Sequence, residues 1–189
     1  MNTKKGLFSL IAIAFFTVAQ ADQVSVEQKE SKISVSGTST VHDWEMSTSL
    51  IDGSTQFIRS DDGRVEIAGT KISLKASDLS SGNSSLDKKA YEALKSEKYS
   101  TITFVQTAKV AVRENNGEFT ATLSGNLTIA GKTKPATVTI KGSSAHNRLK
   151  VSGKVPLKMT DFDMEPPRAM MGAIKSGNEV TVNFDTVLK

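Results

Sequence analysis

FTATLSGNLTIAGKTKPATVTI, residues 119–140, carries the pattern that decides the fold. Gly131 interrupts it with the tight turn Ala130-Gly131-Lys132. A period of two places alternate side chains on one face of an extended strand. The stretch therefore predicts two antiparallel strands joined by that turn, and each strand has one apolar face and one polar face. The apolar positions that define the period are Phe119, Ala121, Leu123, Leu127, Ile129, Val138 and Ile140.

The same alternation recurs along the chain and indicates eight strands in all. Turn residues separate the runs at Asp61-Asp62-Gly63, Asn115-Asn116-Gly117 and Ser176-Gly177-Asn178. Eight long strands joined by tight turns predict an all-β fold, an eight-stranded antiparallel barrel whose interior has room for one small ligand. A two-sheet sandwich is the alternative. The six further alternating runs are 33–35, 72–76, 102–104, 108–112, 149–157 and 180–184.

One segment, SSLDKKAYEALKSEKY at residues 84–99, has a helical period instead. Its apolar residues Leu86, Ala90, Ala93 and Leu94 recur at intervals of three and four. Ser84, followed three residues later by an acid, matches a capping box. We expect one short helix that covers an end or a flank of the barrel.

The first 21 residues predict a cleaved secretory signal peptide. Two lysines precede an apolar run over 7–18, which is shorter than the roughly 20 residues needed to cross a bilayer and ends in Ala19-Gln20-Ala21. The chain has no cysteine, which excludes a lipid-modified N-terminal cysteine and disulfide bonds. We therefore expect export, cleavage after Ala21, and one domain over residues 22–189 that is not membrane-spanning.

Composition argues against several function classes. Loss of the predicted leader would lower the formal net charge from +4 to about +2, and the basic residues are dispersed, so no nucleic acid partner is expected. With no cysteine and only His42 and His146 as imidazoles, no metal site is predicted. No GxSxG motif occurs, and in a strand His42 and Asp43 point to opposite faces. We predict neither catalytic residues nor a cofactor.

Three blocks resemble the YceI family of bacterial periplasmic polyisoprenoid-binding proteins. They are LDKKAYEALKSEKYSTITF at 86–104, LSGNLTIAGKTKPATVTI at 123–140 and PPRAMMGAIKSGNEVTVNFDTVL at 166–188. The resemblance implies a lipocalin-like, eight-stranded barrel domain that holds a long isoprenoid, and a periplasmic location. The chain departs from the family pattern at STVHDWEMSTSLIDGSTQF, residues 39–57, where Asp43 and Trp44 follow His42.

Two concentrated features suggest a ligand site, and each has two interpretations. Trp44 and Met46 share a strand face, and either line a cavity with His42 near its mouth or pack as an ordinary core corner. The methionine-rich stretch 159–171 suits either a gate that adapts to an apolar ligand or a plug that closes the core. Arg168 is a candidate contact for a phosphate or quinone head group.

The sequence thus predicts a carrier that works by sequestration and transfer. Its expected partner is a polyisoprenoid or another long apolar lipid, such as an isoprenoid quinone, and a homodimer is left open. A stress or interaction protein with a packed barrel is one alternative; an enzyme acting on a lipid head group through His42 with Asp161 or Asp163 is another. His42 and Arg168 are the candidate head-group contacts. The candidate ligand-binding residues are nine in the strand wall, Trp44, Met46, Phe57, Ile72, Leu74, Ile102, Phe104, Leu127 and Ile129, and four in the methionine-rich stretch, Phe162, Met164, Met170 and Met171.

Overall fold

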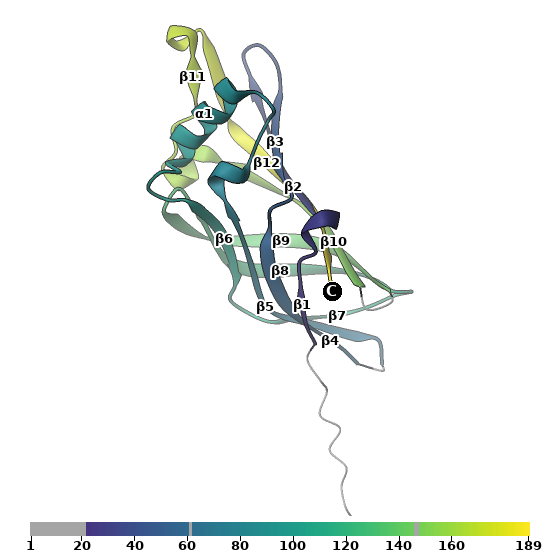
Figure 1. The fold of residues 1–189 in the computed structure, drawn as a ribbon. Coiled ribbons are helices and arrows are strands. Elements are labelled where there is room, and N and C mark those ends of the chain that lie inside the picture. Colours follow the sequence, from purple (N-terminus) through teal and green to yellow (C-terminus); the bar gives the residue numbers. More distant parts are fainter. Residues whose placement is uncertain (1–21, 61, 146–147) are drawn as a thin grey trace, which may run out of the picture.

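The computed structural model describes residues 22–60, 62–145 and 148–189 as a curled antiparallel β-sheet with one α-helix (Figure 1). The predicted signal peptide, Asp61 and His146 lie outside these residues. The helix is α1 (Ser84–Leu94), and the short 3₁₀ turns are η1 (Gln28–Glu30), η2 (Ala76–Asp78), η3 (Met159–Phe162) and η4 (Met170–Gly172). The strands are β1 (Asp22–Ser25), β2 (Lys32–Ser39), β3 (Trp44–Thr48), β4 (Asp52–Arg59), β5 (Arg64–Lys75), β6 (Thr101–Gln106), β7 (Val110–Arg113), β8 (Glu118–Ile129), β9 (Lys132–Ala145), β10 (Arg148–Lys158), β11 (Arg168–Ala169) and β12 (Ile174–Leu188).

The sheet curls until β1, its first strand, meets the C-terminal end of β12. Neighbouring strands follow the order β1-β4-β5-β6-β8-β9-β10-β12-β2-β3, with β7 paired to β5 and β11 to β12. Beyond β1, Val26 bridges to Leu188, and the amide of Ser25 donates to the carbonyl of Lys189 at 2.8 Å. Within the described ranges, no helix has the length and apolar character to cross a bilayer.

The all-β antiparallel class was predicted correctly, but the strand count of eight was too low. The four strands beyond the predicted runs are β1, β3, β4 and β11. Of these, β1 and β11 have only four and two residues, too few to display a period. The inward face of β4 has the polar Thr55 two residues before Phe57, so the strand shows no alternating apolar run.

The predicted turns were right at three sites and wrong at a fourth. Asp62-Gly63 joins β4 to β5, with a positive φ at Gly63, and Asp61 lies outside the described residues. Asn116-Gly117 and Ala130-Gly131 both have positive φ values, as tight hairpin turns require. Ser176-Gly177-Asn178 is no turn; it forms an irregularity inside β12, where the pairing with β2 shifts between Ser176 and Val180. The strand therefore continues over fifteen residues instead of starting after a loop.

Aromatic rings on the inner face of the sheet lie over glycines of the neighbouring strand. Phe119 stands opposite Gly142, and Phe184 opposite Gly153. In each pair the ring occupies the space that a Cβ atom on the glycine would need. A strand glycine allows such close approach, so large rings fit inside a tightly curled sheet without forcing the strands apart.

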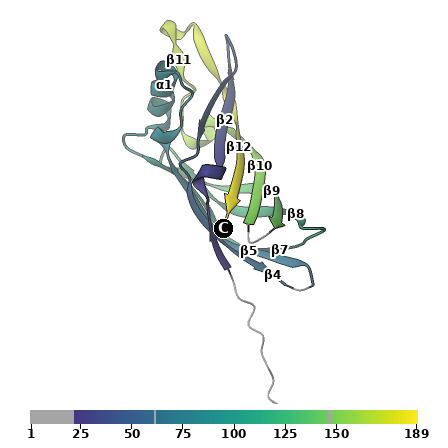
Figure 2. The same ribbon diagram turned by 45° about the vertical axis from the view of Figure 1, so that its right-hand side comes forward.

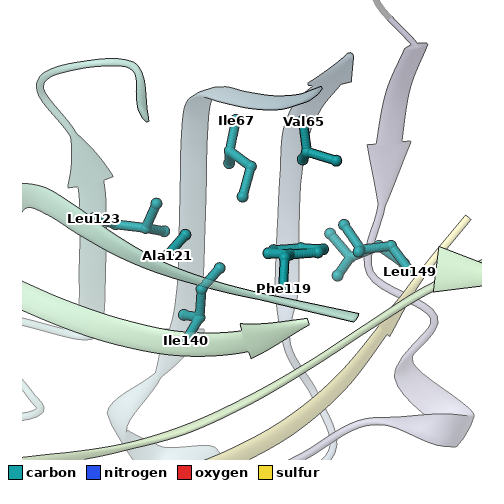
Figure 3. Packing of buried hydrophobic residues seen from close by; sticks show 8 residues of the cluster. Val65, Ile67, Phe119, Ala121, Leu123, Ile140 and Leu149 are labelled. Carbon is teal, nitrogen blue, oxygen red and sulfur yellow. The ribbon is translucent and has the colours of Figure 1, made fainter. Parts of the chain in front are cut away.

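The interior has a packed end and an end covered by the helix. At the packed end, Phe57 and Phe119 have ring centroids 5.9 Å apart, and Figure 3 shows the side chains around Phe119 in mutual contact. At the other end, Leu86, Ala90 and Leu94 of α1 pack toward a second cluster that includes Met46 and Leu74. The buried members of the packed end are Val65, Ile67, Phe119, Ala121, Leu123, Ile140, Leu149 and Leu188.

Helix α1 begins one residue earlier than the predicted capping box implies. The N-cap is Asn83, whose Oδ1 accepts hydrogen bonds from the amides of Ser85 and Leu86. Asp87, the acid of the predicted box, instead accepts hydrogen bonds from Ser80 and Ser81 of the preceding loop. These bonds tie the loop to the first turn of the helix and hold the helix across the end of the barrel.

Candidate functional site

An apolar cavity of about 490 Å³ lies between the packed core and helix α1. Inward-facing side chains of β2, β3, β4, β5, β6, β8, β9, β10 and β12 form its wall, and the inner face of α1 forms its cover. The volume falls within the roughly 300–1,000 Å³ usual for small-molecule sites. Apolar side chains make up most of the lining, so the cavity favours hydrocarbon over water.

Twelve of the fifteen candidate residues line this cavity. His42 and Arg168 are among them, and ten are candidate ligand-binding residues: Trp44, Met46, Ile72, Leu74, Ile102, Phe104, Leu127, Ile129, Phe162 and Met164. The other three do not line the cavity, which corrects the wall position predicted for Phe57 and the cavity-side position predicted for Met170 and Met171. Phe57 belongs to the packed core with Phe119, while Met170 and Met171 are 73% and 108% exposed. Contact of any of these residues with a ligand stays a prediction.

The indole of Trp44 is held in place at the rim of the cavity. Its Nε1 donates to the carbonyl of Thr38 and to Oγ of Ser176, each at 3.1 Å. The ring lies over Gly37 of β2 and also lines the cavity. Both interpretations of Trp44 therefore hold, because one face of this strand supplies core and cavity wall together.

His42 lies just before β3, in the turn that follows β2. The hydroxyl of Ser39 donates to the carbonyl of His42 at 2.7 Å and accepts from its amide at 3.2 Å. The imidazole is exposed and lines the mouth of the cavity. The turn is also joined to the β11–β12 hairpin, because the amide of Thr40 donates to the carbonyl of Lys175 at 3.0 Å. Figures 1 and 2 show β11, α1 and the β2–β3 turn at one end of the molecule.

The methionine-rich stretch divides into a buried part and an exposed part. Met159 and Phe162 are the buried first and last residues of η3. Met164 packs against the cluster that contains Phe162 and lines the cavity. Met170 and Met171 project into solvent from a backbone with positive φ at both residues. The buried part fits the predicted plug. The exposed part does not, and the gate interpretation stays a prediction.

The acids considered as partners for His42 are engaged with lysines. Lys134 Nζ lies 3.3 Å from Asp161 Oδ1, and Lys132 Nζ lies 2.8 Å from Asp163 Oδ2. The hydrogen bond from Lys132, followed by its charge, holds the pKa of Asp163 below its usual range. Across the described part of the chain, no three His, Asp or Glu side chains gather where they would hold a metal ion.

Sequence reasoning missed two parts of the cavity. The first is the inner face of α1, whose residues Leu86, Ala90, Ala93 and Leu94 were seen as a helix stripe but not as ligand wall. The second is a set of buried threonines, Thr55, Thr70 and Thr186, that line the cavity among the apolar side chains. The helix stripe was a usable signal; the threonines had none, because polar residues in a strand normally face solvent.

This geometry defines a class: a small antiparallel β-barrel with an apolar internal cavity. A family model described as YceI-like domain matches residues 17–188, and the chain belongs to this family. The resemblance to the YceI family is thereby confirmed.

Solved structures with the same fold come from several bacteria. BcnA from Burkholderia cenocepacia is 18% identical with a TM-score of 0.65, and the match covers 86% of this chain and 98% of that one. A polyisoprenoid binding domain from Saccharophagus degradans is 12% identical with a TM-score of 0.66, covering 90% and 99%. The Campylobacter jejuni YceI protein is 14% identical with a TM-score of 0.57, covering 94% and 89%. No curated protein sequence matches the chain.

Proposed function

We propose that the protein is a periplasmic carrier that holds a polyisoprenoid or a similar long-chain lipid, such as an isoprenoid quinone. The observation that carries the proposal is the apolar cavity of about 490 Å³ between the packed core and α1. Membership of the YceI-like family and the fold shared with a polyisoprenoid binding domain support it. A fully packed barrel, which the stress or interaction alternative requires, would leave no such space.

The energetics of hydrocarbon burial suit this role without a reactive residue. Each buried CH₂ group contributes about 0.8 kcal/mol, so ten carbons contribute roughly 8 kcal/mol before costs. Micromolar affinity needs about 8 kcal/mol net, and association itself costs several kcal/mol. The cavity must therefore enclose appreciably more than ten carbons, which favours a long chain over a small apolar molecule.

A head group at the mouth would meet polar side chains from two hairpins. His42 precedes β3, and Arg168 lies in β11, where it stands opposite Lys175. Both candidate residues line the cavity at the end covered by α1. In this proposal they orient a phosphate or quinone head group and catalyse no reaction.

The proposal includes export. The leader over residues 1–21 directs the chain across the inner membrane, and cleavage after Ala21 releases the domain into the periplasm. N-terminal sequencing of the protein recovered from a periplasmic extract should begin at Asp22. An N-terminus at Met1 in the exported protein would contradict this part of the proposal.

Titration with defined lipids tests the binding itself. The purified protein, stripped of lipid by solvent extraction and refolded, is titrated with solanesol, a long isoprenoid alcohol, while the fluorescence of Trp44 is recorded. Trp44 is the only tryptophan of the chain and lines the cavity, so occupation should change its emission. Saturable micromolar binding is the expected result. A refolded protein whose emission and calorimetric signal both stay unchanged would overturn the proposal.

A further inference from the structure

Three buried polar side chains on neighbouring strands form a patch at the floor of the cavity. Thr55 of β4, Thr70 of β5 and Gln106 of β6 are each at least 91% buried. Thr55 and Thr70 line the cavity, with Ile67 of the packed core on one side of Thr70 along β5 and Ile72 of the cavity wall on the other.

A single bulge in the pairing of β4 with β5 turns Thr70 inward, beside Thr55, which already shares the inward face of β4 with Phe57. Thr55 lies at this register shift, and Gly69 has a φ of +62° just before Thr70. Beyond Gly69 the inward positions of β5 change from odd to even numbers, so Thr70 follows Ile67 on the inner face. Without the irregularity, the hydroxyl of Thr70 would face outward.

The amide of Gln106 fixes the direction of the hydrogen bonds. Its Nε2 donates to the carbonyls of Ile67 and Ala108, at 3.0 and 2.7 Å. Its Oε1 therefore faces Thr70, and accepts from the amide of Thr70 at 3.0 Å and from the hydroxyl of Thr70 at 2.7 Å. The single proton of that hydroxyl is used in this bond.

The same donor-to-acceptor direction extends to the hydrogen bond between Thr55 and Thr70. Oγ1 of Thr55 lies 2.8 Å from Oγ1 of Thr70, and only the proton of Thr55 is left to occupy that contact. The carbonyl of Ala68, 3.3 Å away, would compete for the same proton. In either arrangement Thr55 donates within the protein, and its oxygen keeps accepting capacity. A hydroxyl oxygen becomes a stronger acceptor when its own proton is donated. The series of hydrogen bonds from Gln106 through Thr70 therefore ends at the oxygen of Thr55, which can accept a hydrogen bond from a ligand but has no proton left to donate.

We propose that the cavity floor selects a neutral hydroxyl group, so that a long-chain isoprenoid alcohol binds hydroxyl-first with Thr55 as its acceptor. This inference rests on the proposed lipid-binding function and narrows its substrate class. For such an alcohol it reverses the orientation that His42 and Arg168 would give a charged head group, because the hydroxyl lies at the floor and the end of the hydrocarbon chain lies at the mouth. A carbonyl or ether oxygen at the same place would face only the lone pairs of the Thr55 oxygen and could form no hydrogen bond with it. A phosphate would meet no cation, because Lys89, Lys158 and Arg168, the lysines and arginine among the described lining residues, belong to α1, the end of β10 and β11.

Matched ligands test the selection. Geranylgeraniol, geranylgeranial and geranylgeranyl methyl ether share one hydrocarbon chain, and only the alcohol carries a donor. Each is titrated into lipid-free protein, with Trp44 emission and calorimetry as readouts. We expect the alcohol to bind about 3- to 10-fold more tightly than the other two, the range that one net hydrogen bond supplies.

Two variants separate hydrogen bonding from shape. Thr55→Val keeps the side-chain volume and leaves no donor unpaired, because Thr70 still donates to Gln106. Its preference for the alcohol should fall to within 2-fold, while Thr55→Ser should keep the preference. Urea unfolding verifies that both variants fold.

The outcomes distinguish this inference from the function on which it rests. Equal binding of all three ligands to the unmodified protein, or an alcohol preference that survives Thr55→Val, overturns the hydroxyl-first inference and leaves lipid binding standing. Failure of all three ligands to bind overturns both.

Discussion

Trp44 of β3 stands directly opposite Gly37 of β2, and its indole fills the space that a side chain at residue 37 would occupy. Gly37→Ala should therefore displace the ring and weaken its hydrogen bonds to Thr38 and Ser176. We expect a loss of about 1–3 kcal/mol in the free energy of unfolding, the usual cost of overpacking. Urea denaturation followed through Trp44 emission measures it. Ser36→Ala, on the same strand, is the control and should change stability by less than about 0.5 kcal/mol.

The cover of the cavity offers a way to fill it without disturbing the sheet. Ala90 of α1 lines the cavity, whereas Lys88, two residues earlier, is exposed. Ala90→Phe should weaken isoprenoid binding by about tenfold or more, since the added ring takes volume from the ligand; Lys88→Phe should bind as the parent does. Calorimetric titration of both variants provides the comparison. Equal affinities would mean that the ligand does not use the space beneath α1.

Asp87, in the first turn of helix α1, should make the stability of the protein depend on pH in the acid range. Partial burial opposes ionisation of this carboxyl, but hydrogen bonds from Ser81 and Ser80 outweigh it and hold its pKa below the usual 3.8. A lowered pKa in the folded state contributes stability above pH 3.8, and that contribution is lost as the pH falls through the folded pKa. Asp87→Ala should cost about 1–2 kcal/mol at pH 7.

The pH dependence distinguishes this charge from an ordinary packing contact. The difference in unfolding free energy between the parent and Asp87→Ala should shrink below pH 3.8. Urea titrations at pH 7, 4 and 3 measure it. A difference that stays constant over this range would show that the carboxylate contributes through shape alone.

Exposure predicts the order in which the methionines oxidise. Met170 and Met171 project into solvent, whereas Met46 and Met159 are 3% and 6% exposed. Limited treatment with hydrogen peroxide should convert Met170 and Met171 to sulfoxides first. Peptide mass spectrometry at several times gives the order. Equal rates at all four positions would contradict the burial of the inner pair.

The alternating pattern predicted most of the inner face of the sheet correctly. Ile72 with Leu74, Ile102 with Phe104, and Leu127 with Ile129 all line the cavity, because a period of two leaves only two choices of face and burial selects the apolar one. Phe57 follows the same rule but lies farther along the barrel, in the packed core. Periodicity assigns a residue to a face and says nothing of its height in the barrel.

Other features were out of reach for physical reasons. Met170 and Met171 were predicted to contact the ligand because methionine adapts to apolar shapes, yet the tight η4 turn at the tip of the β11–β12 hairpin projects them into solvent. Thr70 faces inward only because a bulge at Gly69 shifts the alternation of β5, and a bulge leaves no mark on a hydrophobic pattern beyond a break in it. Thr55 shares the inward face of β4 with Phe57, but its polar side chain gives no hydrophobic signal for that face.

Native mass spectrometry of the protein isolated from its own host tests the central claim, that the cavity beneath α1 holds a long apolar lipid. The sample is taken from a periplasmic extract without detergent, and the bound molecule is identified after solvent extraction. We predict a one-to-one complex whose extra mass belongs to an isoprenoid or similar long-chain lipid, with a smaller bound fraction in the Ala90→Phe variant. A protein that carries no lipid, with or without added host lipid extract, would contradict the claim.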